Sequence, residues 1–69
     1  MVLCGRYRHF KGTEYIVTDI VTHTETGERM VVYHSIEDPS HRWVRPFDMF
    51  IQEVDRPDYK GPRFIKIGD

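Results

Sequence analysis

The sequence predicts a small all-β domain with the architecture of an SH3-like barrel, and three observations lead to this prediction. Short segments rich in Val, Ile, Tyr, Thr and Phe fit the half-buried surface of a pleated sheet. Turn signals such as Lys11-Gly12 and Lys60-Gly61-Pro62 separate these segments at short intervals. No stretch of ten or more residues shows the apolar period near 3.6 that is typical of an amphipathic helix.

The length and charge of the chain narrow the possible classes of protein. Sixty-nine residues leave room for one domain, spanning 1–69. Ten Lys and Arg against eleven Asp and Glu give a net charge of -1, which argues against a general binder of nucleic acid or membrane surfaces. A single cysteine excludes an internal disulfide, and no apolar stretch has the length of a signal peptide or a membrane helix. We therefore expect a soluble, cytoplasmic protein that is a monomer or a weak dimer.

Five to six short strands are predicted from the apolar alternation and the turn residues. Within the second segment, Tyr15, Val17 and Val21 fall on one face, but Ile20 falls on the other. A bend or bulge near Thr18-Asp19 would restore the phase and let this strand serve two sheets. The turn before Glu28 has Gly27, which can take a positive φ. The expected strands are residues 5–10, 14–24, 28–36, 42–45, 51–54 and 63–67.

One segment departs from the strand pattern. From Pro46 to Phe50 we expect one short helical or 3₁₀ turn, because proline suits a first helical turn and Phe47 and Phe50 would then share a side. These rings would plug one end of the barrel. Residues 57–62 are expected to form an exposed loop. An OB-like barrel is the second choice, because it usually needs a longer chain.

Known catalytic and metal-binding patterns are missing from the sequence. The four histidines have no i, i+2 or i, i+4 pair, so no metal is predicted. No Gly-rich loop opens onto a helix to hold a phosphate, and no cofactor is predicted. Neighbouring serine, histidine and acidic residues lie in probable turns without a nucleophile elbow or a shaped cleft. No catalytic residue is therefore assigned.

Mixed aromatic and cationic segments are the strongest candidate for a binding surface. They are "RYRHFKG" at 6–12, "RWVRP" at 42–46 and "GPRF" at 61–64. Arginine planes beside aromatic rings suit an anion that carries a flat ring, such as a nucleotide. Taken one at a time, Tyr7, Phe10, Trp43 and Phe64 are expected in the core, with the arginines lying over them.

These segments also carry a family resemblance. The blocks "YRHFKGTEYIV", "HTET", "VVY", "WVRP", "MF" and "PRF" stand in the order and spacing of a small bacterial family, domain of unknown function 1653. The sequence resembles this family from Tyr7 to Ile67. The resemblance implies an SH3-like barrel and no known activity. Two positions depart from the family pattern: Asp19 stands where glycine is usual, and Glu37 stands where an aromatic residue is usual.

The resemblance adds weight to polar residues that packing alone does not require: His9, Lys11, His23, Arg45 and Arg63. We hypothesise a non-enzymatic binding module that recognises a small anionic ligand, a nucleotide, nucleic acid or a peptide. Arg45 or Arg63 would clamp a phosphate or carboxylate. The histidines would donate hydrogen bonds and make binding depend on pH. The candidate ligand-binding residues are His9, Lys11, His23, Trp43, Arg45 and Arg63.

Two other classes of function stay open at this point. A small enzyme could use His9 or His23 as a general base beside Glu25, which requires a carboxylate within hydrogen-bond reach of the imidazole. A structural or protein-interaction domain could pair an exposed edge strand with a protein partner or with itself. The charges of Arg6 and Arg8 argue against such pairing if their strand is an edge.

Overall fold

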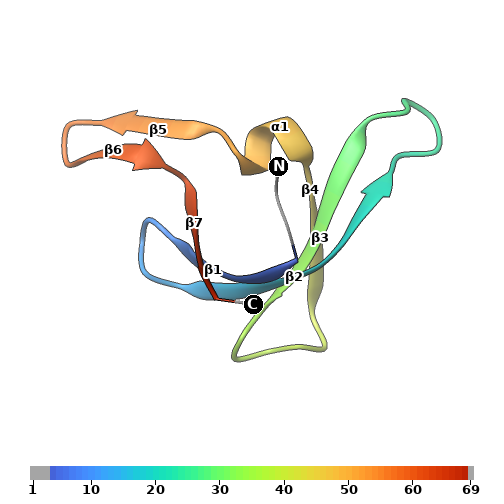
Figure 1. Ribbon diagram of the computed structural model, residues 1–69, viewed down its shortest axis with the longest axis horizontal. Helices are drawn as coiled ribbons and strands as arrows, with labels where there is room; N and C mark the ends of the chain where they lie inside the picture. Colours follow the sequence, from blue (N-terminus) through green and yellow to red (C-terminus); the bar gives the residue numbers. More distant parts are fainter. Residues whose placement is uncertain (1–3, 69) are drawn as a thin grey trace.

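The chain folds into a curved antiparallel sheet of five strands and a separate two-stranded hairpin (Figure 1). This computed structural model describes residues 4–68. The sheet has the strand order β4-β3-β2-β1-β7, and β5 pairs with β6. The fold is therefore all-β, as predicted. The elements are β1 (Gly5–His9), β2 (Glu14–Thr22), β3 (Arg29–Ser35), β4 (Arg42–Pro46), α1 (Phe47–Phe50), β5 (Glu53–Arg56), β6 (Tyr59–Pro62) and β7 (Phe64–Gly68).

A bulge in β2 lies at the predicted position. The register between β2 and β3 shifts between Val17 and Asp19. Before the shift Val17 is opposite Tyr33, and after it Ile20 is opposite Val31. Directly opposed residues of antiparallel strands share a face, so the extra residue brings Ile20 onto the same face as Val17. The bulge thus explains why the apolar pattern of this segment loses its phase.

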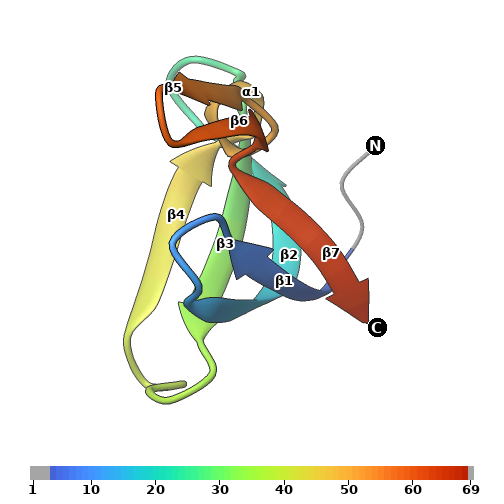
Figure 2. The ribbon, with the colours of Figure 1, turned by 90° about the vertical axis from the view of Figure 1, so that its left-hand side faces the viewer.

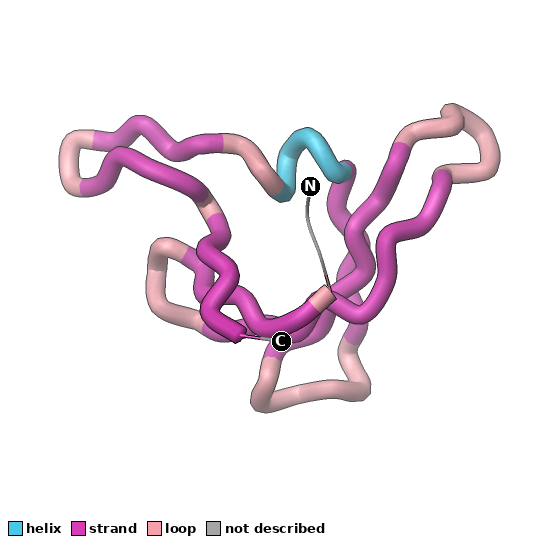
Figure 3. Tube along the Cα trace, viewed as in Figure 1, coloured by secondary structure: helices cyan, strands magenta, loops and turns pink. Residues whose placement is uncertain are grey.

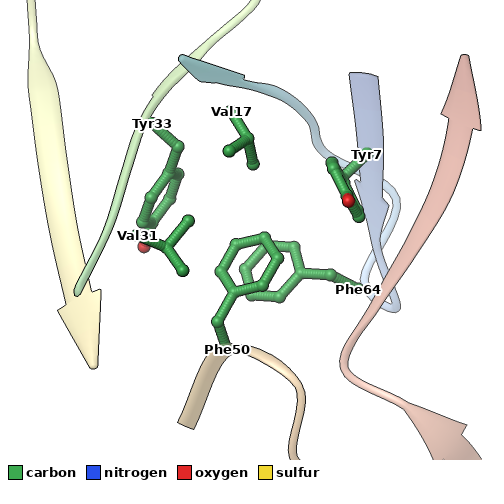
Figure 4. Packing of buried hydrophobic residues seen from close by; sticks show 6 residues of the cluster. All are labelled: Tyr7, Val17, Val31, Tyr33, Phe50 and Phe64. Carbon is green, nitrogen blue, oxygen red and sulfur yellow. The ribbon is translucent and has the colours of Figure 1, made fainter. Parts of the chain in front are cut away.

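The core lies on the concave face of the sheet and is mostly aromatic (Figure 4). The rings of Phe50 and Phe64 stack with centroids 4.2 Å apart and planes 3° from parallel. Tyr7 and Tyr33 meet Phe50 edge-on, at 5.4 Å and 5.7 Å between centroids. Such aromatic pairs stabilise the core beyond the area that they bury. The buried cluster consists of Tyr7, Val17, Val31, Tyr33, Phe50 and Phe64.

The helix α1 closes the open side of the curved sheet, as Figure 3 shows. Phe50 points into the core and is 1% exposed, while Phe47 is partly buried against the same cluster. Pro46 precedes the helix with φ -54, and Ile51 ends it. The prediction that a short helical turn between two strands carries core-filling rings is confirmed. None of the helices in residues 4–68 is long and apolar enough to cross a membrane.

Three details differ from the sequence-based expectations. The expected loop at 57–62 contains the strand β6, where the Tyr59 hydroxyl donates to the Pro62 carbonyl at 2.7 Å. The strand β1 is internal, between β2 and β7, so Arg6 and Arg8 do not lie on an edge. The edges of the main sheet are β4 and β7, and Figure 2 shows them on opposite sides. Because the β5–β6 hairpin pairs separately, hydrogen bonding does not close the barrel.

Candidate functional site

His9 is the last residue of β1 and is fixed by the tight turn that follows it. The Lys11 amide donates to the His9 Nδ1 at 3.2 Å, and the Gly12 amide donates to the His9 carbonyl at 2.8 Å. Gly12 has φ 106, a conformation that L-residues with a side chain rarely adopt. In the neutral imidazole, an accepting Nδ1 leaves Nε2 as the atom that carries the proton. The turn therefore presents His9 with one nitrogen available to donate to a ligand.

The His9 ring is half-buried between aromatic side chains. It lies against the Phe10 ring, with centroids 4.6 Å apart, and meets the Phe64 ring edge-on at 5.0 Å. Register explains the second contact, because His9 and Phe64 are directly opposed in the β1–β7 pair. Phe64 in turn stacks on Phe50, so the packing of the core fixes the position of His9.

The charges that act on His9 are all positive. Burial lowers the pKa of His9, and the neighbouring charges of Arg63, Arg45 and Lys11 lower it further. Each of these effects disfavours the charged imidazolium. The structure thus brings together four of the candidate residues that lie far apart in the sequence. We call His9, Lys11, Arg45 and Arg63 the cationic cluster.

Arg45 reaches the cluster from β4. It is opposite Val31 in the β3–β4 pair, and Val31 is completely buried, so Arg45 also lies on the concave face. Its guanidinium carbon is 5.7 Å from the centroid of the Phe64 ring. A guanidinium over a ring at this distance is a cation–π contact. Arg45 therefore packs against the same ring that contacts His9.

Arg63 joins the cluster from the short connection between β6 and β7. Its backbone amide donates to the Gln52 carbonyl at 3.1 Å, and its carbonyl accepts from the Phe10 amide at 2.9 Å. These bonds tie the β5–β6 hairpin to the β1–β2 turn. The Arg63 Nε is buried and has no hydrogen-bond partner. An unsatisfied buried donor is costly, and such a group in a native protein commonly bonds to water or an ion.

No carboxylate within residues 4–68 pairs with Lys11, Arg45 or Arg63. The ion pairs in this part of the chain use other cations: Arg6 and Arg8 with Glu14, Arg56 with Asp58, and Lys60 with Asp55. None of the three cations of the cluster is therefore held in an ion pair with a described carboxylate.

A second aromatic contact extends the cluster toward the β5–β6 hairpin. The Phe10 and Tyr59 rings stack at 5.1 Å between centroids, 16° from parallel. The Lys11 Nζ and the Arg56 guanidinium lie 5.9 Å and 5.6 Å from the Phe10 centroid. Sequence reasoning missed Tyr59, because its segment was expected to be a loop, and it missed Arg56, which directly precedes that segment. A tyrosine two residues after proline was the available signal, and it is a weak one.

His23 lies away from the cluster. It follows β2, whose nine residues at about 3.3 Å each separate it from the β1–β2 turn by roughly 25–30 Å of strand. Figure 1 shows the two turns at opposite ends of the molecule. The His23 Nδ1 accepts from the amides of Glu25 and Thr26 at 3.1 Å and 3.3 Å. These bonds give His23 a structural role in its own hairpin.

Trp43 lies on the same strand as Arg45, two residues earlier. It is opposite Tyr33 in the β3–β4 pair, so it faces the concave side of the sheet. Its ring stacks on His41 with centroids 4.2 Å apart and is 46% exposed. The expectation that Trp43 belongs to the core is wrong. The strand β4 is at the edge of the sheet, so a side chain on β4 has a neighbouring strand on one side only. Tyr7 and Phe64 are buried as expected, and Phe10 is half-buried.

The surface beside the cluster is hollowed next to Lys11. A hollow of about 510 Å³ adjoins the cluster at Lys11, and its other walls include Glu14, Ile36 and Glu37. Its two carboxylates disfavour an anion inside the hollow itself. Within residues 4–68, no group of three or more His, Cys, Asp or Glu side chains could hold a metal ion.

Fold and cluster together define a class: a small, partly open β-barrel domain with cations gathered at one end. The chain belongs to the family described as Protein of unknown function (DUF1653), whose model matches residues 5–66. A crystal structure of a protein belonging to DUF1653 from Bordetella bronchiseptica is similar to it, with a TM-score of 0.85 and 29% identity over 97% of this chain and 88% of that chain. No curated protein matches the chain. The resemblance inferred from the sequence blocks is thus confirmed.

Proposed function

We propose that this protein is a non-enzymatic binding module that takes a small anionic ligand at the cationic cluster. One observation carries the proposal: Lys11, Arg45 and Arg63 act together on a half-buried His9, and no described carboxylate pairs with any of them. Like charges gathered in this way repel one another. A bound anion would relieve that repulsion, so the arrangement favours anion binding.

The contacts around the cluster support a ligand with both a charge and a ring. Arg45 and Arg63 can each form the paired hydrogen bonds that guanidinium makes with phosphate or carboxylate. The Nε2–H of neutral His9 would add a third donor. The stacked rings of Phe10 and Tyr59 would provide apolar contact area beside Lys11, and Trp43, two residues before Arg45 on β4, would add to it. A mononucleotide combines these properties.

The geometry gives less support to a small enzyme. The contact between His23 and Glu25 uses the backbone amide of Glu25, and the two residues lie in an exposed turn. No ion pair or hydrogen bond in residues 4–68 joins His9 or His23 to a carboxylate. A general base needs such a partner, or a positioned substrate, to orient its ring.

The proposal is tested by titrating the ¹⁵N-labelled protein with inorganic phosphate, adenosine and adenosine 5′-monophosphate. We expect saturable amide shifts at His9, Lys11, Arg45 and Arg63 with the monophosphate, weaker binding of phosphate alone, and no shifts at His23. The Arg45→Gln and Arg63→Gln variants should each lose tenfold or more in affinity, since charge-assisted hydrogen bonds contribute about 1.5–3 kcal/mol.

Arg42→Gln is the matched control. Arg42 lies on the same strand as Arg45 but is opposite His34, on the convex face, and the substitution changes the net charge equally. Its affinity for the monophosphate should stay within about twofold of the unmodified chain, because a distant exposed charge is screened by salt. Equal losses of affinity in Arg42→Gln and Arg45→Gln would mean that the net charge of the protein, and not the position of Arg45, determines binding. If none of the three compounds gives a saturable shift at about 10 mM, this ligand class is ruled out. Any remaining binding free energy would then be smaller than about 3 kcal/mol.

A further inference from the structure

The strand β4 leaves one edge of the main sheet unpaired, as Figure 2 shows. It also carries large apolar side chains into solvent: Trp43 is 46% exposed and Val44 is 59% exposed. Proteins usually protect a free edge strand with charges that point along the edge, with a bulge or with a covering segment, because its backbone groups can pair with another strand. No strand in residues 4–68 pairs with the outer edge of β4, and β4 is regular throughout its pairing with β3. Its protection is limited to the charges of Arg42 and Arg45 and to Pro46, which cannot donate a backbone hydrogen bond.

The opposite edge is protected in a way that β4 is not. The strand β7 pairs with β1 through a register shift between Arg6 and Tyr7. A bulge of this kind twists an edge strand and interrupts its regular donors and acceptors. The edge most suited to pair with another strand is therefore β4.

The sequence of β4 is complementary to itself in one antiparallel register. Two copies related by a twofold axis must place equivalent residues opposite each other, so the axis can pass at Trp43, Val44 or Arg45. An axis at Arg45 opposes two arginines, and an axis at Trp43 places His41 opposite Arg45. An axis at Val44 opposes valine to valine, Trp43 to Arg45 of the other copy, and Arg42 to Pro46. Of the three, this last register alone opposes no arginine to another arginine or to a histidine.

The register centred on Val44 also makes a favourable contact twice. Trp43 and Arg45 both lie on the concave face, because they are opposite Tyr33 and Val31 in the β3–β4 pair. Directly opposed side chains approach within about 5 Å, which suits a tryptophan ring and a guanidinium. On the convex face, the two exposed Val44 side chains would cover each other.

We infer that β4 pairs with β4 of a second copy of this chain, in the antiparallel register centred on Val44. The two main sheets then join into one sheet of ten strands across the dimer. A contact made by one short strand from each copy is small, so the dimer is weak, with a dissociation constant on the order of 0.1–1 mM. The proposed dimer shares Trp43 and Arg45 with the proposed anion site, but it depends on the strand edge and not on a ligand, and substitutions at Val44 leave both of those residues unchanged.

The test follows self-association of the full chain from about 10 μM to 2 mM by analytical ultracentrifugation and by amide shifts. The only tryptophan of the chain is Trp43, so its fluorescence reports directly on this edge. We expect a monomer–dimer equilibrium, shifts concentrated in residues 42–46, and a change in Trp43 emission with concentration. A monomer over the whole range would overturn the inference.

Two substitutions at the same position test the register. Val44→Lys and Val44→Glu each place like charges opposite each other across the twofold axis, so each variant alone should dimerise at least tenfold more weakly. Mixing the two variants places opposite charges at the axis and should restore association. Val44 is exposed, so neither change should disturb the fold, and a folding defect would not be rescued by mixing.

Ile65→Lys is the control on the other edge, because Ile65 is 47% exposed on β7. It should leave dimerisation unchanged. Loss of the dimer in Ile65→Lys with retention in Val44→Lys would assign the interface to β7 and contradict the inference. Failure of the mixed Val44 variants to associate would show that these residues are not opposed.

Discussion

Replacing Phe50 by alanine should be among the most destabilising single changes in this protein. Phe50 is 1% exposed, stacks on Phe64 and meets Tyr7 and Tyr33 edge-on. Truncating a fully buried phenylalanine costs about 3–5 kcal/mol, because transfer free energy is lost and a cavity remains. At roughly 0.05–0.15 kcal/mol per residue, a chain of 69 residues has a total stability of about 3–10 kcal/mol. The substitution therefore removes a third or more of the stability.

Urea denaturation followed by far-ultraviolet circular dichroism measures this effect. If Phe50→Ala is too unstable for a folded baseline, Phe50→Leu retains most of the volume but loses the three ring contacts, and it should cost about 1–2 kcal/mol. Met49→Ala is the matched control. Met49 is the preceding residue of the same short helix and is 52% exposed, so its loss should stay within about 0.5 kcal/mol.

The reasoning would be refuted by a loss below about 1 kcal/mol in Phe50→Ala, since that value is far outside the range for a buried ring. Equal losses in Phe50→Ala and Met49→Ala would also refute it, because they would place both side chains in equivalent surroundings. Phe50 additionally fixes Phe64, which contacts His9 and Arg45. We therefore expect Phe50→Leu to shift the His9 resonances as well.

Two further predictions concern the histidines. The folded state lowers the pKa of His9, first by burial and then through the charge of Arg63. The stability that neutral His9 contributes is therefore fully present above the unfolded pKa and is lost as pH falls through the folded pKa. The free energy of unfolding should thus decrease less on acidification in His9→Gln than in the unmodified chain. NMR titration should also give a raised His9 pKa in Arg63→Gln, and an unchanged value would mean that Arg63 does not act on the ring. For the other turn, His23→Ala should lose about 0.5–1.5 kcal/mol and His23→Asn less, because an amide oxygen can accept the same backbone bonds. Anion affinity equal to that of the unmodified chain is expected in both His23 variants, and a tenfold loss would place His23 in the ligand site.

Local patterns in the sequence were enough to predict most strands. Alternation from Met30 to Ser35 fixes which side chains share a face, and the same rule identified the phase slip in β2 as a bulge near Thr18. Both are properties of neighbours along the chain, so no tertiary information was needed. The turn at Gly27, with φ 74, and the proline before α1 are likewise local choices.

The grouping of the candidate residues could not be predicted in the same way. His9 and His23 look alike in sequence, since each is followed by a turn and each accepts a backbone amide at its Nδ1. They differ because His23 follows β2 at the far end of the sheet, whereas His9 is opposite Phe64 in the β1–β7 pair and so lies beside Arg63, the residue before Phe64. Trp43 is exposed for a similar reason: strand order, and not its own chemistry, makes β4 an edge.

Periodicity, turn chemistry and ordered blocks of residues were enough to predict the all-β class, the family and the short helix that fills the core. Which cations meet depends instead on the order and curvature of the strands. Arg45 and Arg63 are 18 positions apart and reach His9 from β4 and from the β6–β7 connection, and the curvature of the sheet and the packing of Phe64 bring them together. The local sequence around a strand does not show which distant strand it pairs with. The positions of the site residues are therefore known only from the assembled sheet.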